Sequence, residues 1–186
     1  YGNDTILIFT SQGNTIKIPV NSLKECKWRE KGQSLLSIDK NIILNETPVK
    51  VMKLPSGEGS ILFMTKQGYV KKSDVKDMVV NKSFYQVCKL NEGDEVKNVE
   101  LDKSGKSILM LTRKGMSLNF DKGDIPTQGR ISAGVKGINL DENDSVIFAK
   151  QVDFTSIVAV TDNGYIKKVA VKEFPLSQRY RKGVKY

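Results

Sequence analysis

Histidine is absent from this sequence of 186 residues, and cysteine occurs only twice, as Cys26 and Cys88. Histidine is the commonest general base and a frequent zinc ligand, so its absence argues against most acid–base enzymes and against zinc sites. The two cysteines form no Cys-x-x-Cys pair. Their spacing favours two free thiols in a reducing compartment over one disulfide in a secreted protein.

Long apolar runs and a phosphate-binding loop are also missing. Runs such as 61–64 have the length of a strand, far below the ~20 residues of a membrane span, so we expect no membrane partner. Lys136 is followed by Gly137 rather than by the Ser or Thr of a Walker-type loop. The chain begins without Met on polar residues, and we interpret it as a fragment of a longer protein. We expect no catalytic residue, no metal and no cofactor in it.

Acidic residues are in the minority, with 21 Asp and Glu against 30 Lys and Arg and a net charge of +9. A basic excess of this kind raises the local concentration of polyanions. The excess is concentrated toward the end of the chain, because the residues from Gly164 to Tyr186 contain seven cations and the single acid Glu173. The charge pattern therefore indicates a nucleic acid as partner, and an acidic protein remains the alternative.

Internal repetition dominates the sequence. One pattern consists of four apolar residues, a threonine, two polar residues and a glycine, and it recurs at intervals of roughly fifty residues, at 6–13, 61–68, 108–115 and 157–164. A second element, Leu-Asx-Glu, begins at Leu44, Leu90 and Leu140. A third, Gly-Val-Lys, occupies 134–136 and 183–185. Several motifs that share one period indicate a repeat protein.

Each unit has a physical interpretation. The apolar run predicts a buried strand, and the glycine supplies the positive φ that a tight hairpin needs. The Leu-Asx-Glu element predicts a second turn that leads into strands at Val49, Val96 and Val146. Acids in these turns, such as Asp94 and Asp144, are expected to form turns rather than to bind metal. Segments 75–78 and 171–174 are predicted to be single helical turns.

About four short strands per unit of this length are typical of propeller blades. We therefore expect an all-β fold in one domain, 1–186, with repeat units at roughly 1–50, 51–100, 101–150 and 151–186.

The most specific segment, 129–144, contains Gly-Arg, then Gly-Val-Lys-Gly, then Leu and an acidic turn. It resembles the C-terminal domain of the A subunit of bacterial type IIA topoisomerases, meaning gyrase and topoisomerase IV, and the resemblance runs along essentially the whole chain. Segments 18–20 and 27–33 look nearer to the topoisomerase IV of Gram-positive bacteria. Segment 178–183 matches the Gly-rich basic box of gyrase only in part. The choice between the two enzymes stays open.

The resemblance implies a propeller-like β-pinwheel, with four-stranded blades that exchange strands and about four repeats visible. It implies that double-stranded DNA is bent around a basic outer rim and that the domain guides the choice of DNA crossover. The parent protein would be an ATP-dependent DNA topoisomerase in the bacterial cytoplasm, associated with the nucleoid. Its DNA-cleaving tyrosine would lie in the rest of the A subunit, through which the ATPase B subunit would be a partner. The alternative function is a propeller-type scaffold that binds an acidic protein.

The predicted DNA-binding residues are cations that recur at matching places in the units. They are Lys27, Arg29, Lys31, Lys66, Lys71, Lys72, Arg113, Lys114, Arg130, Lys136, Lys167, Lys168, Arg179, Arg181, Lys182 and Lys185. Neighbours in a strand face opposite sides, so one lysine of each adjacent pair can face a given surface. Protection of a strand edge or ordinary solvated turn charge would also explain some of these cations. Trp28 and Tyr180 are expected to pack at a sheet edge rather than to stack on bases.

Overall fold

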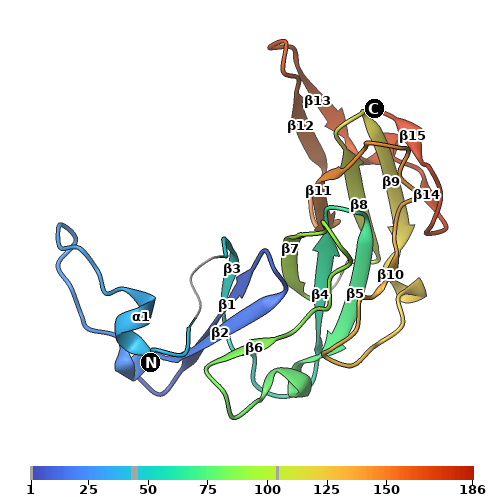
Figure 1. Ribbon diagram of the computed structural model, residues 1–186. Coiled ribbons are helices and arrows are strands. Elements are labelled where there is room, and N and C mark those ends of the chain that lie inside the picture. Colours follow the sequence, from blue (N-terminus) through green and yellow to red (C-terminus); the bar gives the residue numbers. More distant parts are fainter. Residues whose placement is uncertain (1, 43–45, 104) are drawn as a thin grey trace.

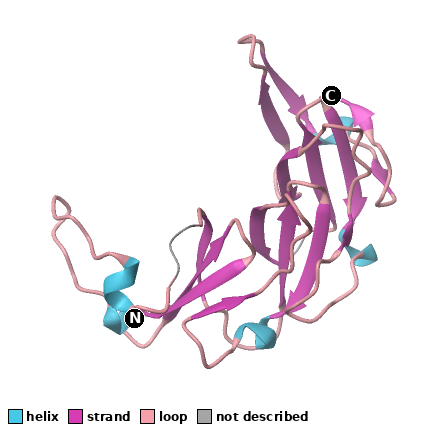
Figure 2. Ribbon diagram, viewed as in Figure 1, coloured by secondary structure: helices cyan, strands magenta, loops and turns pink. Residues whose placement is uncertain are grey.

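The computed structural model describes residues 2–42, 46–103 and 105–186. Most of its regular structure is β-strand, as Figure 2 shows. The early strands are β1 (Thr5–Thr10), β2 (Asn14–Pro19), β3 (Pro48–Lys53), β4 (Ser60–Thr65), β5 (Tyr69–Asp74), β6 (Phe84–Gln86) and β7 (Val96–Leu101). The later strands are β8 (Ser107–Thr112), β9 (Met116–Asp121), β10 (Val135–Lys136), β11 (Val146–Gln151), β12 (Ser156–Val160), β13 (Ile166–Ala170), β14 (Leu176–Ser177) and β15 (Val184–Lys185).

Helix is confined to short segments in the described residues. The α-helix α1 (Leu35–Ile38) is one turn long, and the 3-10 turns are η1 (Val20–Ser22), η2 (Val75–Met78), η3 (Lys122–Asp124) and η4 (Val171–Glu173). The helical turns predicted at 75–78 and 171–174 are therefore confirmed by η2 and η4. The strands predicted at Val96 and Val146 begin at those residues as β7 and β11. The first Leu-Asx-Glu element lies partly outside the described residues.

Each apolar run pairs with the strand that follows it in an antiparallel hairpin, giving β1–β2, β4–β5, β8–β9 and β12–β13. The glycine that ends each run has a φ between 78° and 81°. Side chains rarely adopt this conformation, whereas glycine adopts it freely. The predicted hairpin turns are thus confirmed in all four repeats.

Three sheets are completed by strands that come later in the sequence. Their strand orders are β3-β1-β2-β6, β10-β5-β4-β7 and β11-β8-β9-β14, and β15 also pairs with β9. The strand β6 follows β5 in the sequence but pairs with β2, which belongs to the preceding hairpin. In the same way β10 pairs with β5, and β14 and β15 pair with β9. Strands are therefore exchanged between successive sheets.

The fourth unit differs from the prediction of four strands per unit. Among the described residues, β12 and β13 pair only with each other. The physical reason lies in the exchange, because every hairpin obtains its outer strands from sequence that follows it. The hairpin nearest the end of the described chain is therefore the one without them.

The sheets follow one another along an arc (Figure 1). On the concave side, β3 contacts β7 and β7 contacts β11. The exchanged strands β6, β10, β14 and β15 lie on the convex side. We define the rim as the segments that carry these exchanged strands, residues 84–89, 130–139 and 176–186.

The core lies between the sheets, and this explains the continuous apolar runs. Ile61 and Phe63 on β4 pack with the first sheet, whereas Leu62 and Met64 on the same strand pack with the third. Alternate side chains of a strand point to opposite faces, so a strand that is covered on both faces is apolar throughout. Burial of each such side chain contributes about 1.5–3 kcal/mol.

Candidate nucleic-acid interface

The rim is continuous because its three segments bind one another through the backbone. The amide N–H of Lys89 donates to the carbonyl of Ser132 at 3.0 Å, and Asn139 donates to Arg181 at the same distance. Tyr180 donates to the carbonyl of Gly137 at 2.6 Å. The exchanged segments therefore form one hydrogen-bonded border along the convex side of the three sheets.

Glycine is required where two exchanged strands meet their hairpins. Gly134 and Gly183 have φ values of 83° and 81°. A Cβ atom at Gly134 would overlap the carbonyl oxygen of Val70, and one at Gly183 would overlap that of Ser117. The Gly-Val-Lys element thus marks the close approach of the exchanged strand. The first copy of this strand, β6, has Phe84 at the matching place and was not identified from the sequence.

Seven of the predicted DNA-binding residues lie on the rim or beside it. Arg181, Lys182 and Lys185 are exposed, and Lys136 is half-buried, with its ammonium group 5.3 Å from the centre of the Tyr69 ring. Lys72 is half-buried on β5, and its carbonyl accepts a hydrogen bond from Gln128 beside the rim. The other two are Arg130 and Arg179, also half-buried.

The predicted turn cations make local contacts. Lys66 lies 3.7 Å from a carboxylate oxygen of Glu95, and the ammonium group of Lys114 donates to the carbonyl of Glu142 at 2.5 Å. Arg113 and Lys114 are exposed at the tip of β8–β9. Exposed contacts of this kind stabilise a fold by little, about 0–1 kcal/mol, so these side chains stay available to a ligand.

Five further predicted residues lie beyond the rim, near the two ends of the arc (Figure 1). Lys27, Arg29 and Lys31 are exposed on the loop between η1 and α1. Lys167 and Lys168 are both exposed on β13, which has no exchanged strand beside it among the described residues.

The position of Lys71 contradicts the prediction that this residue binds DNA. Its side chain is 1% exposed, and its ammonium group donates to the carbonyls of Val87 and Arg130, both at 2.5 Å. It also lies 5.3 Å from the centre of the Phe63 ring. Lys72 lies on the opposite face of the strand and is only half-buried. Lys71 joins two rim segments from inside and cannot contact DNA.

The prediction that Trp28 and Tyr180 pack at a sheet edge is also wrong. Trp28 is 86% exposed and Tyr180 is 53% exposed, so neither is packed into a sheet edge. The guanidinium group of Arg29 lies over the Trp28 ring, 4.4 Å from its centre.

Sequence analysis also missed Lys89, which is exposed on the first rim segment. The repeat gave no signal for it, because Gln86 matches Lys136 in register and Lys89 therefore matches Asn139, which carries no charge. The first rim segment also lacks the Gly-Val-Lys pattern that marks the later two.

The acidic turns have a structural role. The Asp94 carboxylate accepts hydrogen bonds from the backbone N–H groups of Gln67 and Glu95, both at 2.8 Å. Asp144 accepts from Lys114 at 3.0 Å and from Ser145 at 2.8 Å. Each carboxylate therefore fastens a hairpin turn to the start of the outer strand of the same sheet, β7 or β11, as expected of turn-forming acids.

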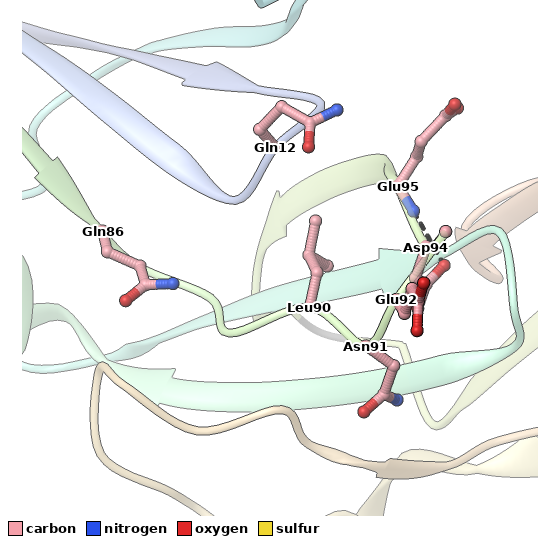
Figure 3. A pocket seen from close by; sticks show the side chains of 8 residues that line it. Gln12, Gln86, Leu90, Asn91, Glu92, Asp94 and Glu95 are labelled. Atoms are coloured by element: carbon pink, nitrogen blue, oxygen red, sulfur yellow. Dashed lines mark hydrogen bonds between the residues drawn. The ribbon is translucent and has the colours of Figure 1, made fainter.

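A hollow of about 460 Å³ lies beside the first of these turns (Figure 3). Its lining includes Glu92, Asp94 and Glu95 together with Gln12 and Gln86. The lining contains three carboxylates and no cation, a charge that does not favour phosphate. Among the described residues, no cluster of His, Cys, Asp or Glu is arranged to hold a metal ion.

Both cysteines are free thiols in the structure, as predicted. Cys26 is exposed, whereas Cys88 is buried beneath the rim, and burial raises the pKa of its thiol to about 11.

Strand-exchanged sheets arranged along an arc, with cations on the convex side, define a propeller-like all-β repeat protein. The family model described as the DNA gyrase C-terminal domain, a beta-propeller, matches residues 4–41, 59–101, 106–153 and 155–186. Each stretch contains one of the four hairpins. The chain belongs to this family.

Relatives of two kinds match the chain. It is 33% identical to the A subunit of DNA topoisomerase 4 from Bacillus subtilis, over 97% of the chain and 23% of the relative. It is also 33% identical to the A subunit of DNA gyrase from Staphylococcus epidermidis, over 98% of the chain and 21% of that relative. The chain thus spans less than a quarter of the length of these relatives.

Among solved structures, a C-terminal domain of DNA topoisomerase IV superimposes with a TM-score of 0.92 and 30% identity. The match covers 99% of this chain and 58% of the other. A gyrase A C-terminal domain superimposes with a TM-score of 0.74 at 21% identity, and covers 99% of this chain and 60% of the other, which supports the fold. In the described part of the chain, no helix has the length and apolar character needed to cross a bilayer.

Proposed function

We propose that this chain is a single β-pinwheel domain, 1–186, whose four repeats are blades that bind and bend double-stranded DNA along the rim. It would do so as the non-catalytic part of a bacterial type IIA topoisomerase A subunit. That subunit would lie in the cytoplasm and associate with the nucleoid. The observation that carries the proposal is the continuous convex rim with exposed Arg181, Lys182 and Lys185.

The rim provides both shape and charge for this task. Cations that follow a convex border neutralise phosphates at successive positions along the duplex and release condensed counterions. Bending a site of a few helical turns costs about 1–6 kcal/mol, which further phosphate contacts offset. The exposed candidates on the loop between η1 and α1 and on β13 would extend the path at either end. Arg113 and Lys114 would add contacts from a hairpin tip.

A salt titration of duplex binding tests the proposal. We expect the logarithm of the binding constant to fall linearly with the logarithm of the salt concentration. Replacement of Arg181, Lys182 and Lys185 by alanine should reduce the slope by about 0.9 for each phosphate contact that is lost. The matched control replaces Lys50, Lys53 and Lys97, three exposed lysines of the concave strands β3 and β7, and should leave the slope unchanged.

Two results would contradict the proposal. One is equal slopes for the rim and control variants, which would show that charge acts without regard to position. The other is weak duplex binding at low salt, which would favour a scaffold for an acidic protein.

We further propose that the domain guides the choice of DNA crossover within an A subunit that assembles with an ATPase B subunit, as in topoisomerase IV. Support comes from segment 178–183, which departs from the Gly-rich basic box of gyrase. The expected result is little writhe when the chain binds a relaxed circle that is then nicked and resealed. A large writhe of one sign would instead support wrapping of the gyrase type.

A further inference from the structure

The loop between η1 and α1 projects from the first sheet at the left of Figure 1. We define residues 23–34 as the arm. The backbone N–H of Lys24 donates to the side-chain carbonyl of Gln33 at 2.5 Å and closes the base of the arm. Near its tip, Glu30 donates to the carbonyl of Lys27 at 2.9 Å. The arm is therefore a closed loop with a turn at its end.

Trp28 lies in that turn and is the only tryptophan in the sequence. Its indole ring is 86% exposed, although water solvates so large an apolar surface poorly. The arm contains four exposed cations, Lys24, Lys27, Arg29 and Lys31, and two exposed acids, Glu25 and Glu30, so its net charge is +2. The Arg29 guanidinium lies over one face of the ring, 4.4 Å from its centre, so a flat ligand would stack on the other face. An exposed aromatic ring beside an excess of cations suits a ligand that offers a flat ring and a negative charge together.

The place of the arm in its repeat points to the same ligand. The arm follows the 3-10 turn η1, just as segments of the rim follow η2, η3 and η4. Those segments continue into strands that pair with a preceding hairpin, whereas no residue of the arm belongs to a strand. The arm thus occupies the position of a rim segment at the first end of the arc, with its tip directed into solvent.

We propose that the arm is a second DNA contact, in which Trp28 stacks on a base at a distorted step of the bent duplex while the arm cations bind the flanking phosphates. The inference rests on the proposed function and names a residue beyond the rim. Apolar side chains that enter a base step unstack it in part and kink the duplex, and flexible steps such as TA yield most readily.

Trp28 itself is the reporter for the test, because no other tryptophan contributes to the emission. On titration with a duplex that has a central TA step, we expect quenching of the emission and protection of the indole from acrylamide. An A-tract duplex of equal length should quench less. Trp28→Ala should lower duplex affinity by about 5-fold or more, and Trp28→Phe should restore part of the loss.

The control is Tyr165→Ala, which alters an aromatic residue of 76% exposure at the tip of β12–β13. It should leave affinity unchanged. Salt-dependent duplex binding with Trp28 still open to acrylamide would overturn the role of the arm and leave the proposed function intact. Quenching by single-stranded oligonucleotides alone would also overturn it. Absence of duplex binding at low salt would overturn the proposed function itself.

A second inference comes from two arginines that lie one repeat apart on the rim. Arg130 donates from Nη1 to the carbonyl of Gln86 at 2.7 Å, and Arg179 donates from Nη1 to the carbonyl of Lys136 at 3.0 Å. Gln86 pairs with Asn14 and Lys136 pairs with Tyr69, and each partner directly follows a turn glycine. The two carbonyls therefore occupy the same register position in successive sheets.

The geometry assigns Arg130 and Arg179 as positioning residues that hold each rim segment at a fixed distance from the one before it. An arginine on a backbone carbonyl is a charge-assisted donor, and its planar group fixes direction as well as distance. The fixed distance sets the interval between phosphate-binding side chains on neighbouring sheets, and with it the curvature imposed on DNA.

The test compares Arg179→Gln with Arg181→Gln, which changes an exposed neighbour. We expect Arg179→Gln to change the bend angle of a bound duplex, measured by energy transfer between its ends, with little change in salt slope. Arg181→Gln should lower the slope and preserve the angle. Arg179→Lys, which retains a charged donor group but not the planar guanidinium, should restore the angle in part. The assignment would be overturned if Arg179→Gln lowered the slope as much as Arg181→Gln and left the angle unchanged.

Discussion

At the scale of single residues, Lys71 differs in role from the residues at the matching positions of the other hairpins. The matching residues of the neighbouring hairpins are Ile16 and Leu118, both buried. In the second unit the long apolar stem of Lys71 fills the same space, and its ammonium group reaches the carbonyls of Val87 and Arg130. A buried charge is tolerated because two carbonyls satisfy it.

The pKa of Lys71 supplies a pH test of this arrangement. Burial lowers the pKa of Lys71 from 10.5 to about 8. Between these values the unfolded chain holds a proton that the folded chain has released, so the free energy of unfolding rises with pH in that window. We expect the difference in stability between the protein and Lys71→Met to shift in favour of the lysine as pH increases from 8 toward 10. Urea unfolding at several pH values measures it, and a constant difference would contradict it.

At the scale of elements, the exchanged strands β10 and β15 depend on a close backbone approach that no side chain permits, whereas β6 has Phe84 at the matching place. Gly134 meets Val70 in this way, whereas Gly115, in the turn of β8–β9, has a similar φ of 81° and open space around it. Comparison of these two glycines therefore distinguishes the free-energy cost of the left-handed backbone conformation from the cost of steric overlap with a neighbouring strand.

Alanine at each of these glycines should have different effects on stability. Gly115→Ala is expected to cost about 1–2 kcal/mol, because only the left-handed conformation is strained. Gly134→Ala should cost about 2–5 kcal/mol, since overlap with the β5 backbone adds to that strain. Denaturant unfolding measures both. Equal losses would mean that β10 can move away from β5 without consequence.

At the scale of the whole molecule, the two ends of the arc are covered differently. On the first sheet, Ile8 and Ile16 pack with Leu35 and Ile38 of α1 and with the buried Ile42. On the last hairpin, the exposed fractions of Val158 and Val160 are 62% and 66%. The matching residues of the third sheet, Leu109 and Leu111, are buried against the last hairpin.

This asymmetry predicts a gradient of local stability. In stacked repeats each unit depends on its neighbours, so a unit covered on one face opens more readily than one covered on both. We expect backbone amides of β12 and β13 to exchange with solvent fastest among the hairpins, and those of β4, β5, β8 and β9 slowest. Hydrogen exchange followed by mass spectrometry tests this. Equal protection of 156–170 and 107–121 would contradict it.

Several features could be predicted from local residues alone. The four hairpins, the 3-10 turns at 75–78 and 171–174, and the turn-forming role of Asp94 all follow from short patterns whose physics is local. The exchange partners of individual strands could not be derived in this way, because β6 and β10 pair with residues far away in the sequence. The burial of Lys71 and the exposure of Trp28 could not be predicted either, because both depend on how segments distant in the sequence pack.

By itself, the sequence determined the period, the β-strand character and the basic charge, since each is a property of consecutive residues. Only the tertiary structure decided which cations face solvent. Lys71 and Lys72 are identical in type and adjacent in the chain, yet one lies beneath the rim and the other beside it. The reason is that alternate side chains of a strand face opposite sides, and the side that is covered depends on where the next sheet packs.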